Sequence, residues 1–539
     1  MNRFTRAAAT VTTAALGGLL LTACVETGGG SSDPTGDALK PGDQGTLTVA
    51  AATELEDLAP VLEDAEADLG FDIEMYHPGG TLENSQALKA GKMDGQYDAT
   101  WFATNRYVEL IGAGDKLGEQ TSVANSPVAF GVSTEKAREL GWTDHQPTWE
   151  AIGSAAADRE LTYGMTDPSS SNSGFSALVS VATAFAGTGQ ALTTGDLEQI
   201  GPRLEEFFAG QTMSSGSSGW LRDTFLNQPE RADAVVNYES VLHGMRAEDG
   251  ADLEVIVPAD GVVTADYPLS ELAAPGDAAA AEQTAQLAEW LLENQDRVNE
   301  THRRPVDATA QVPEELSDQL LVEAPFPGDL AVTDQLIDSY LNRWRPRGDT
   351  TFILDVSGSM SGGPLDELKS TMSSLIDGSA RTTTGEVGLR DQEFVTLRPF
   401  NTAPQEPAQT DLAETGGKGR AQLESRIDEL QAGGGTDLYP ALEDAYRDIE
   451  DRRGEDPENN RIATIVVLTD GVVEPRYEDF VRFREGLSPE ARKVPVFTVL
   501  YGAADEDEMT RLAELTGGKV FDAREDGIGE VFKEIRAYQ

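Results

Sequence analysis

The feature that most constrains the fold is a regular alternation of short apolar runs with amphipathic segments, which begins at Gly45. The run LTVAA is followed by a stretch with apolar residues at helical spacing, and FDIEMYH is followed by LENSQALKAG. The alternation is repeated in later runs such as AVVNY, TTFILD and ATIVVLT. Strands that alternate with helices predict parallel β-sheets covered by helices, so we expect an α/β protein.

The chain is too long for a single hydrophobic core, because it has 539 residues and domains usually hold about 150. A first α/β block starts at Gly45 and a second covers roughly residues 128–257. Helical sequence follows, and then an Arg/Pro-rich break, RWRPRGD, at residues 343–349. A third α/β block extends from there to residue 539, and we expect two large modules, 45–345 and 349–539.

The first two dozen residues have the pattern of an export signal. Arg3 and Arg6 precede an apolar Ala/Thr/Gly/Leu-rich run, and small residues lead to Cys24. The stretch LTAC resembles a bacterial lipobox, which implies cleavage after residue 23 and lipidation of Cys24; an uncleaved anchor is the alternative. Cys24 is the single cysteine, so it cannot form an internal disulfide. Residues 25–44 are Gly/Ser/Pro/Asp-rich and predict a flexible linker. We therefore expect lipid anchoring on the extracytoplasmic face of the cell membrane.

The charge balance is strongly acidic, with 94 Asp and Glu against 41 Lys and Arg and a net charge of −53. Such a surface repels nucleic acid and anionic lipid, so no nucleic-acid partner and no membrane contact beyond the lipid are expected. The acidic residues are spread along the chain rather than gathered in a tail, which favours a role in solubility. Cationic or metal-bridged partners are the alternative.

Residues 45–345 resemble extracellular solute-binding proteins of the type II periplasmic kind. The resemblance lies in LTVAAATELEDLAPVLEDAEADLG, in YHPGGTLENSQALKAGKMDGQYDATWFA, and in DPSSSNSGFSALV with VVNYES. It implies two α/β lobes joined by crossing strands, with a ligand cleft between them. Lobe one would then comprise about 45–128 and 258–345, and lobe two about 129–257, with hinges near 126–132 and 258–267.

Four residues follow predicted strands or open predicted helices of this module, and the resemblance implies that they are ligand contacts: Thr53, Thr81, Ser173 and Tyr238. Hydroxyls and free backbone N–H groups at helix starts can bind an anion or a carboxylate. The alternative for the Ser and Thr residues is ordinary N-capping. Glu54 departs from the oxyanion-binding members, which argues against an oxyanion ligand. The four histidines are scattered without ligand spacing, which argues against a zinc or manganese receptor.

The stretch FILDVSGSM, residues 352–360, ends an apolar run with three oxygen-bearing side chains, Asp355, Ser357 and Ser359. A hydrolase elbow requires Gly-x-Ser-x-Gly, and the third block contains no histidine for a triad. Phosphate-loop and EF-hand spacings are also absent. Two further candidates follow predicted strand ends or loops of the same sheet, Thr436 after AGGG and Asp470 after ATIVVLT. Because ligands of open α/β sheets gather beyond the carboxyl ends of strands, a metal site is the chemistry that remains.

Together, these five residues resemble the metal-ion-dependent adhesion site of a von Willebrand factor A (VWA) domain covering residues 349–539. The resemblance implies a doubly wound, Rossmann-like sheet with helices on both faces. It also implies that Ser357, Ser359 and Thr436 contact Mg²⁺ directly while Asp355 and Asp470 act largely through water, with Mn²⁺ or Ca²⁺ as alternatives. Residues 361–363 are Ser-Gly-Gly where the integrin subgroup has further acids, so no adjacent calcium site is expected.

The expected function is therefore binding, not catalysis. Neutral hydroxyls neutralise the charge of Mg²⁺ incompletely and leave a coordination position for an Asp or Glu of a protein partner. We expect a lipid-anchored adhesion or assembly protein of the cell surface whose N-terminal module binds, or once bound, a small solute. The alternative is the substrate-binding receptor of an ABC-type transport system with an accessory VWA domain.

Overall fold

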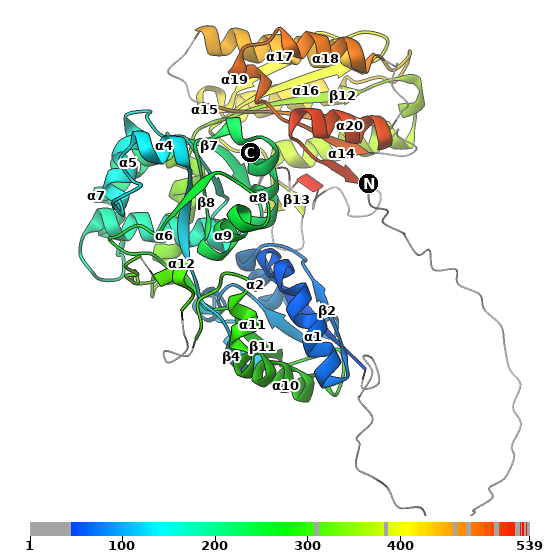
Figure 1. Ribbon diagram of the computed structural model, residues 1–539. Helices are drawn as coiled ribbons and strands as arrows, with labels where there is room; N and C mark the ends of the chain where they lie inside the picture. The colour runs from blue at the N-terminus through cyan, green and yellow to red at the C-terminus, as the bar shows by residue number, and fades with distance from the viewer. Residues whose placement is uncertain are drawn as a thin grey trace, which may run out of the picture. The chain divides into compact units, whose positions relative to one another are not determined.

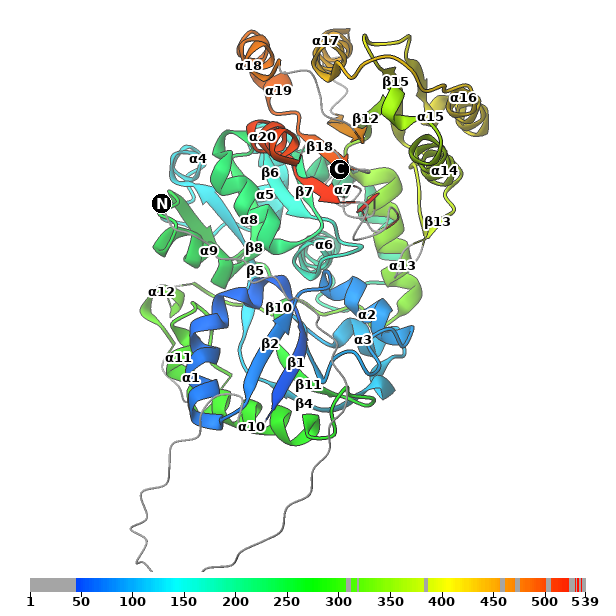
Figure 2. The same ribbon diagram turned by 90° about the vertical axis from the view of Figure 1, so that its right-hand side faces the viewer.

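The computed structural model describes residues 45–306, 312–317, 319–381, 386–455, 461–470, 476–500 and 506–522, together with 529, 531, 532 and 535. The predicted signal peptide, the linker and Cys24 lie outside the described residues. The prediction of an α/β protein is confirmed, because the described residues form three large mixed or parallel-rich sheets with helices against them (Figures 1 and 2).

The first sheet belongs to lobe one and has the strand order β2-β1-β3-β11-β4. Its strands are β1 (Thr46–Ala51), β2 (Asp72–Tyr76), β3 (Ala99–Trp101), β4 (Leu117–Ser122) and β11 (Pro268–Leu272). Strands β1, β2 and β3 are parallel, and β11 is antiparallel to both β3 and β4. The accompanying helices are η1 (Thr53–Leu58), α1 (Ala59–Leu69), α2 (Thr81–Lys89), α3 (Arg106–Leu110), η2 (Gly114–Lys116), α10 (Ala280–Glu293) and α11 (Gln295–Asn299).

The second sheet belongs to lobe two and has the order β10-β5-β8-β6-β7, with β9 also paired to β5. Its strands are β5 (Ser126–Ser133), β6 (Tyr163–Thr166), β7 (Gln211–Ser215), β8 (Ala234–Tyr238), β9 (Leu253–Ile256) and β10 (Thr264–Ala265). Its helices are α4 (Thr134–Glu139), α5 (Trp149–Ala157), α6 (Asn172–Ala186), α7 (Thr194–Phe208), α8 (Ser218–Asn227), η3 (Pro229–Arg231) and α9 (Glu239–Ala247). Helix α6 is buried along almost its whole length, which explains its run of small and apolar residues.

The chain passes between the lobes three times: between β4 and β5, between β10 and β11, and again between α11 and α13. Strand β10 pairs with the start of β5 in lobe two, and β11 pairs with β3 and β4 in lobe one. One expected boundary differs from the structure. Helix α13 (Leu330–Ser339) and the following η4 (Tyr340–Trp344) pack on α7 of lobe two, although residues 258–345 were expected in lobe one. The Tyr340 hydroxyl, 3.0 Å from Gln211 Oε1, fixes this packing.

The C-terminal domain holds the third sheet, with the order β16-β15-β12-β17-β18-β19. Its strands are β12 (Gly348–Asp355), β15 (Glu393–Phe400), β16 (Ala408–Asp411), β17 (Ile462–Thr469), β18 (Val496–Leu500) and β19 (Val520–Asp522). All pair in parallel except β16 at the edge. Every residue of β17 is buried, as expected for a central strand covered on both faces. A short hairpin of β13 (Ala380–Arg381) and β14 (Glu386–Val387) lies outside this sheet.

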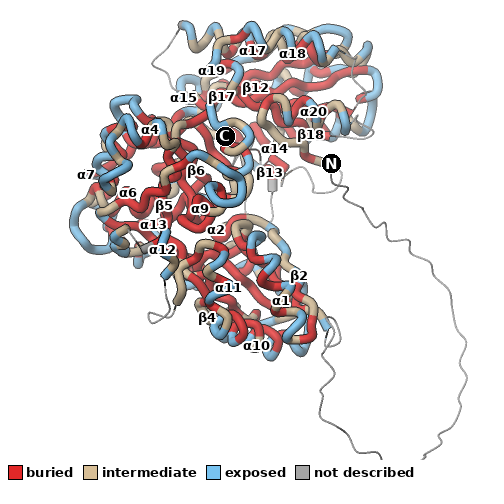
Figure 3. The backbone as a smooth tube through the Cα atoms, in the orientation of Figure 1, coloured by how far each residue is buried: buried red, intermediate tan, exposed pale blue. Residues whose placement is uncertain are grey.

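Helices cover both faces of the third sheet, so it is doubly wound. Phe352 and Leu354 of β12 join one hydrophobic cluster and Ile353 joins the other, as the alternation of side chains along a strand requires. Figure 3 shows the buried strands between helices that are exposed on their outer sides. The domain's helices are η5 (Gly358–Met360), α14 (Gly363–Asp377), α15 (Leu412–Thr415), α16 (Gly417–Asp428), α17 (Leu438–Glu455), α18 (Tyr477–Glu485), α19 (Pro489–Arg492) and α20 (Glu506–Thr516).

A short helix, α12 (Glu314–Ser317), completes the elements of the described chain. Within these described ranges, no helix has the length and apolar character needed to cross a membrane.

Candidate metal centre

The site is built where β12 ends. Asp355 is the last residue of this strand and is fully buried. The backbone N–H of Ser357 donates to Asp355 Oδ1 at 2.7 Å, and the Thr469 hydroxyl donates to Asp355 Oδ2 at 2.6 Å. These two hydrogen bonds hold the carboxylate in one orientation and turn the chain sharply after the strand, so that the side chains of residues 357 and 359 reach the same edge of the sheet.

The neighbouring strand β17 supplies the second carboxylate. Asp470 follows β17 directly, and its Oδ1 accepts a 2.9 Å hydrogen bond from the Ser359 hydroxyl. The hydroxyls of Ser357 and Ser359 are 3.0 Å apart. Because β12 and β17 are adjacent and parallel, their carboxyl ends meet at one edge. Four of the five predicted ligands, namely Asp355, Ser357, Ser359 and Asp470, thus lie in one connected cluster of oxygen atoms.

Burial and charge act together on this cluster. Burial raises the pKa of Asp355 above its ordinary value, and the nearby Asp470 carboxylate raises it further. The hydrogen bonds from Thr469 and Ser357 lower the same pKa and partly compensate. Two carboxylates held near each other on a buried edge create a negative potential, which a bound cation would relieve.

The fifth predicted ligand, Thr436, is half-buried and lies on the glycine loop that precedes α17. Gly358 donates its N–H to Gly434 O at 3.1 Å, which brings this loop against the turn that carries the two serines. Gly434 has φ +92°, a conformation that favours glycine, and a Cβ there would come 2.8 Å from the Thr402 hydroxyl. Of the three glycines before Thr436, Gly434 is therefore the one whose conformation and surroundings require glycine.

Sequence reasoning missed three polar residues at the same edge. Thr469 orients Asp355, the Asn401 side chain donates to Gly433 O at 2.7 Å, and the Thr402 hydroxyl accepts from Gly435 N at 2.8 Å. Asn401 and Thr402 follow β15 directly, just as the predicted ligands follow β12 and β17. Their position after the strand EFVTLRPF was the available signal.

The donor set suits a hard divalent cation. Its members are hydroxyl and carboxylate oxygens, which Mg²⁺ prefers, and thiol and imidazole ligands are not among them. Throughout the described ranges, no three His, Cys, Asp or Glu side chains are grouped as a metal site. A set with two acids and three hydroxyls lies outside that pattern, so this finding does not conflict with the Mg²⁺ prediction.

The four candidate solute contacts lie at the starts of helices or the end of a strand, as expected, but their side chains do not cap helices. The N-cap residues of η1, α2 and α6 are Ala52, Gly80 and Ser171, and none makes a side-chain capping bond. The structure therefore does not support N-capping as the role of Thr53, Thr81 or Ser173.

Three of these four side chains are buried and already hydrogen-bonded. The Thr81 hydroxyl accepts from Ala103 N at 3.3 Å, and the Tyr238 hydroxyl accepts from Asn172 Nδ2 at 2.8 Å. The Ser173 hydroxyl lies 2.8 Å from that of Thr166 and 2.9 Å from that of Ser218. Thr53 alone is half-buried. The structure places all four near the junction of the lobes.

Glu54, an acidic residue to which the sequence assigned no role in binding, lies beside Thr53. Burial raises the pKa of Glu54 to about 7, against lowering by its own backbone hydrogen bond and by Arg303. Arg303 is fully buried, donates to Asp57 Oδ2 at 2.9 Å and to Glu54 O at 2.8 Å, and lies over the ring of Tyr267 at 5.2 Å. Arg303 and Glu54 are 249 residues apart, so no local pattern could pair them.

Two of the histidines lie together despite their separation in sequence. The rings of His243 and His302 stack with centroids 5.9 Å apart, and His302 Nδ1 lies 2.7 Å from Glu315 Oε1. Burial lowers the pKa of His243 to about 4, so this ring is neutral at physiological pH.

Comparison with known proteins identifies the C-terminal domain. Residues 350–472 match the family of von Willebrand factor type A domains. A von Willebrand factor type A structure from Catenulispora acidiphila has 21% identity and a TM-score of 0.28, over 36% of this chain and 42% of its own. The chain thus spans less than half the length of that relative. A comparison with curated proteins found no match.

The N-terminal part has periplasmic binding proteins among its structural neighbours. AfuA of Actinobacillus pleuropneumoniae, solved with fructose-6-phosphate, has 16% identity and a TM-score of 0.44, over 56% of this chain and 98% of its own. A periplasmic thiamin binding protein has 13% identity and a TM-score of 0.45, over 57% and 98%. The family match confirms the VWA resemblance seen in the sequence, and the part of the chain before this domain has periplasmic binding proteins among its structural neighbours.

Proposed function

We propose that this protein is a binding protein of the extracytoplasmic cell surface, anchored through a lipid on Cys24, whose VWA domain holds a protein partner through a metal-bridged carboxylate. The observation that carries the proposal is the oxygen cluster at the carboxyl ends of β12 and β17. In this cluster the Asp355 carboxylate accepts from the backbone N–H of Ser357, the hydroxyls of Ser357 and Ser359 lie 3.0 Å apart, and the Ser359 hydroxyl donates to the Asp470 carboxylate.

The residues that would hold Mg²⁺ are Asp355, Ser357, Ser359, Thr436 and Asp470. Bound there, the ion would supply positive charge and an open coordination position. Asp355 and the hydrogen-bond donors Thr469 and Ser357 preorganise the edge, since the buried carboxylate cannot rotate freely. Ser359 is exposed and Asp470 is nearly buried, so the cluster opens outward on its Ser359 side. An Asp or Glu side chain of a partner can approach from that side.

The N-terminal module would bind a small solute between its lobes, near Thr53, Thr81, Ser173 and Tyr238. This part of the proposal also supports a second candidate function, the substrate-binding receptor of an ABC-type transport system with an accessory VWA domain. The specific observation in its favour is a direct contact between the lobes: Glu83 of lobe one donates its N–H to Ser170 O of lobe two at 3.4 Å. Both candidates are binding functions without catalysis.

Isothermal titration of the full chain with MgCl₂, after EDTA treatment and dialysis, tests the metal site. We expect one Mg²⁺ per chain and at least a tenfold weaker dissociation constant for Asp470→Asn, which removes one charge while preserving side-chain shape. Glu367→Gln is the matched control, because Glu367 is an exposed acid on nearby α14. Equal Mg²⁺ binding by wild type and Asp470→Asn would refute the metal assignment.

The partner and solute are tested separately. Retention of envelope proteins by the immobilised chain in Mg²⁺, and its loss in EDTA and in Asp355→Ala, is expected for the adhesion role; metal-independent retention would argue against it. Native mass spectrometry of the purified chain reports a co-purified solute, which would favour the receptor role. Mass analysis of membrane-extracted protein, with Cys24→Ser as control, tests the lipid anchor.

A further inference from the structure

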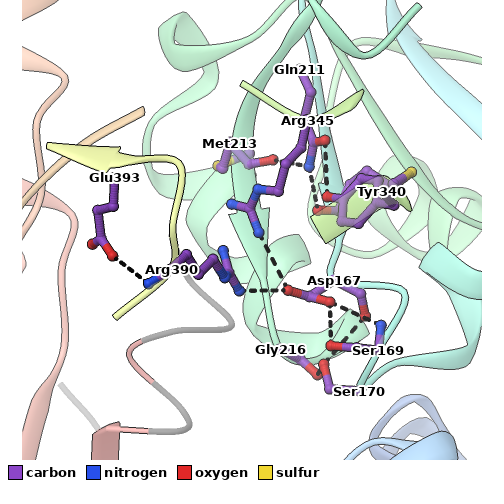
Figure 4. Close-up of polar contacts among 11 residues, drawn as sticks. Asp167, Ser169, Ser170, Gln211, Met213, Gly216, Tyr340, Arg345, Arg390 and Glu393 are labelled. Carbon is purple, nitrogen blue, oxygen red and sulfur yellow. Dashed lines mark hydrogen bonds and ion pairs between the residues drawn. The ribbon is translucent and has the colours of Figure 1, made fainter. Parts of the chain in front are cut away.

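Residues 167–171, between β6 and α6, make contacts in two directions. The Asp167 carboxylate is almost completely buried, and its Oδ1 accepts from Ser169 N at 2.9 Å and from the Ser169 hydroxyl at 2.6 Å. Its Oδ2 faces Arg345 at 3.5 Å and Arg390 at 3.3 Å (Figure 4). Arg390 belongs to the VWA domain and Arg345 to the segment that leads into β12. A loop of lobe two is thus bound by Arg390 of the VWA domain and by Arg345 of the segment that connects the two modules.

The same loop contacts lobe one on its other side. Ser170 O accepts the N–H of Glu83 at 3.4 Å, in the first turn of α2. The approach is so close that a Cβ on Gly80, the N-cap of α2, would lie 2.2 Å from Ser170 O. Ser170, which makes this contact with lobe one, comes only three positions after Asp167, which binds the two arginines. Any movement of lobe one away from lobe two must therefore release one side of this loop.

Helix α8 of lobe two repeats this arrangement independently. The ring of Trp220 lies 6.4 Å from that of Phe497 on β18 and packs against the core of the VWA domain. The preceding residue, Gly219, faces lobe one, and a Cβ there would lie 4.0 Å from Thr53 Cβ. At the C-terminal end of α8, the Gln228 side chain fills the space beside Gly517, just before β19. One helix therefore packs on lobe one and on the VWA domain at once.

These contacts fall on the part of the VWA domain remote from the candidate metal centre. Arg390 precedes β15 and Gly517 precedes β19, and Phe497 is the second residue of β18. All three therefore lie at the amino ends of parallel strands, whereas Asp355 and Asp470 lie at carboxyl ends. Lobe two holds the VWA domain without covering the edge that would meet a partner.

We propose that the two modules are energetically coupled: closure of lobe one on lobe two and seating of the VWA domain on lobe two stabilise each other through residues 167–171 and the first turn of α8. The buried Asp167 charge requires its arginine partners, because an unpaired buried carboxylate is costly. A loop that is ordered by one neighbour is already ordered for the other, which makes the two contacts cooperative. This coupling goes beyond the proposed function and requires neither a metal nor a solute.

A steric wedge in the lobe interface provides the test. Gly80 has φ −70°, so alanine fits its backbone without strain, yet the new methyl would clash with Ser170 O. An ordinary contact needs at least 3.4 Å, so Gly80→Ala must part the two loops by roughly 1 Å. Gly219→Ala is the matched control, since the same added methyl at the same interface meets only an ordinary contact with Thr53.

The movement is measured by pulsed electron–electron spin resonance on the full chain carrying Cys24→Ser. One label pair, Glu63→Cys with Glu198→Cys, reports the separation of the lobes; the other, Ser425→Cys with Glu198→Cys, reports the seating of the VWA domain on lobe two. All three positions are exposed, on α1, α7 and α16. We expect Gly80→Ala to lengthen the distance between the lobes and to broaden the distribution of the distance between lobe two and the VWA domain. Gly219→Ala should leave both distributions unchanged.

The reciprocal variant is Arg390→Gln, which removes the VWA side of the Asp167 contact. We expect it to broaden the seating distance and also to lengthen the lobe distance, because coupling between two equilibria is reciprocal. The proposal is overturned if either variant changes its own distance and leaves the other at the wild-type distribution. It is equally overturned if Gly80→Ala leaves the lobe distance unchanged, since Ser170 would then not be the closing contact.

Discussion

The carboxyl of Glu54 should make the stability of the N-terminal module fall as the pH rises. Glu54 lies on η1, immediately after β1, and burial raises its pKa from 4.5 to about 7 despite the opposing effect of Arg303. In the folded protein the group therefore holds its proton more tightly than in the unfolded chain. Stability is greatest below pH 4.5, declines as the pH passes from 4.5 to 7, and is constant above that range.

The magnitude follows from the two pKa values. Because each tenfold difference in proton affinity corresponds to 1.36 kcal/mol, the interval between 4.5 and about 7 corresponds to about 3 kcal/mol of unfolding free energy lost by pH 8. Glu54→Gln keeps the shape of the side chain and cannot ionise. We expect this variant to be more stable than wild type by about 3 kcal/mol at pH 8 and by less than about 1 kcal/mol at pH 5.

Urea unfolding of the full chain, followed by tryptophan fluorescence at pH 5 and pH 8, measures this difference. Trp101 and Trp149 are buried in the two lobes and report their transitions. Glu56→Gln is the control, because Glu56 is an exposed acid on the same η1 helix and should change stability little at either pH. A gain for Glu54→Gln that is absent at pH 8, or equal at both pH values, would refute the buried-carboxyl reasoning.

Three further predictions test other parts of the structure. Mg²⁺ at about 100 times its dissociation constant should stabilise the VWA domain by about 2.7 kcal/mol, a rise of roughly 5 to 10 °C in its melting temperature, and calorimetry should show no rise for Asp470→Asn. Arg304→Ala leaves the buried Glu239 without the partner that binds it at 2.7 and 2.8 Å, so urea unfolding should show a loss of about 3 to 5 kcal/mol. Gly244→Ala on α9 has open space around its Cβ and should stabilise by about 0.5 to 1 kcal/mol, whereas Gly174→Ala on α6 would place its Cβ 2.1 Å from Thr166 O and should destabilise the chain.

The oxygen cluster at the carboxyl edge was predictable because its residues lie at or directly after the ends of recognisable strands. The apolar runs that became β12 and β17 end at Asp355 and Asp470, and parallel pairing of neighbouring strands brings such ends together. Thr469 was overlooked because it belongs to the strand itself, and its role depends on the orientation of a side chain across the strand pair. The glycines before Thr436 indicated a tight loop, but not the φ of +92° at Gly434 that the loop adopts.

The lobe architecture was predicted less completely. Strands β4 and β11 were not predicted, because LGEQTS and PLSEL are short and mix polar with apolar residues. Their pairing also depends on how the chain crosses between the lobes. Helix α13 reads as an ordinary amphipathic helix, and its sequence does not reveal which lobe it packs on. Tertiary packing decides such placements, and local patterns do not contain it.

Contacts between the modules were the least predictable, since Asp167 and Arg390 are 223 residues apart. In the sequence, Asp167 opens a Ser-rich loop that favoured a role in binding solute, and Arg390 sits in an unremarkable stretch. Their ion pair gives that loop a structural role that the local sequence does not indicate. Residues 167–171 touch lobe one through Ser170 and the VWA domain through Asp167, so a single loop serves the predicted cleft and the attachment of the second module.

The position of lobe two on the VWA domain also bears on how an acidic protein could bind an acidic group. With a net charge of −53, the chain repels a partner's carboxylate at long range, and at physiological salt this repulsion is screened beyond about 8 Å. Asp355 and Asp470 add to it locally. A divalent cation bound between them would offset these two charges at the carboxyl edge of the sheet, which the amino-edge contacts of Arg390, Phe497 and Gly517 leave uncovered. Attachment at one edge and metal-dependent attraction at the other are thus physically separate, and binding of an acidic partner would depend on the ion.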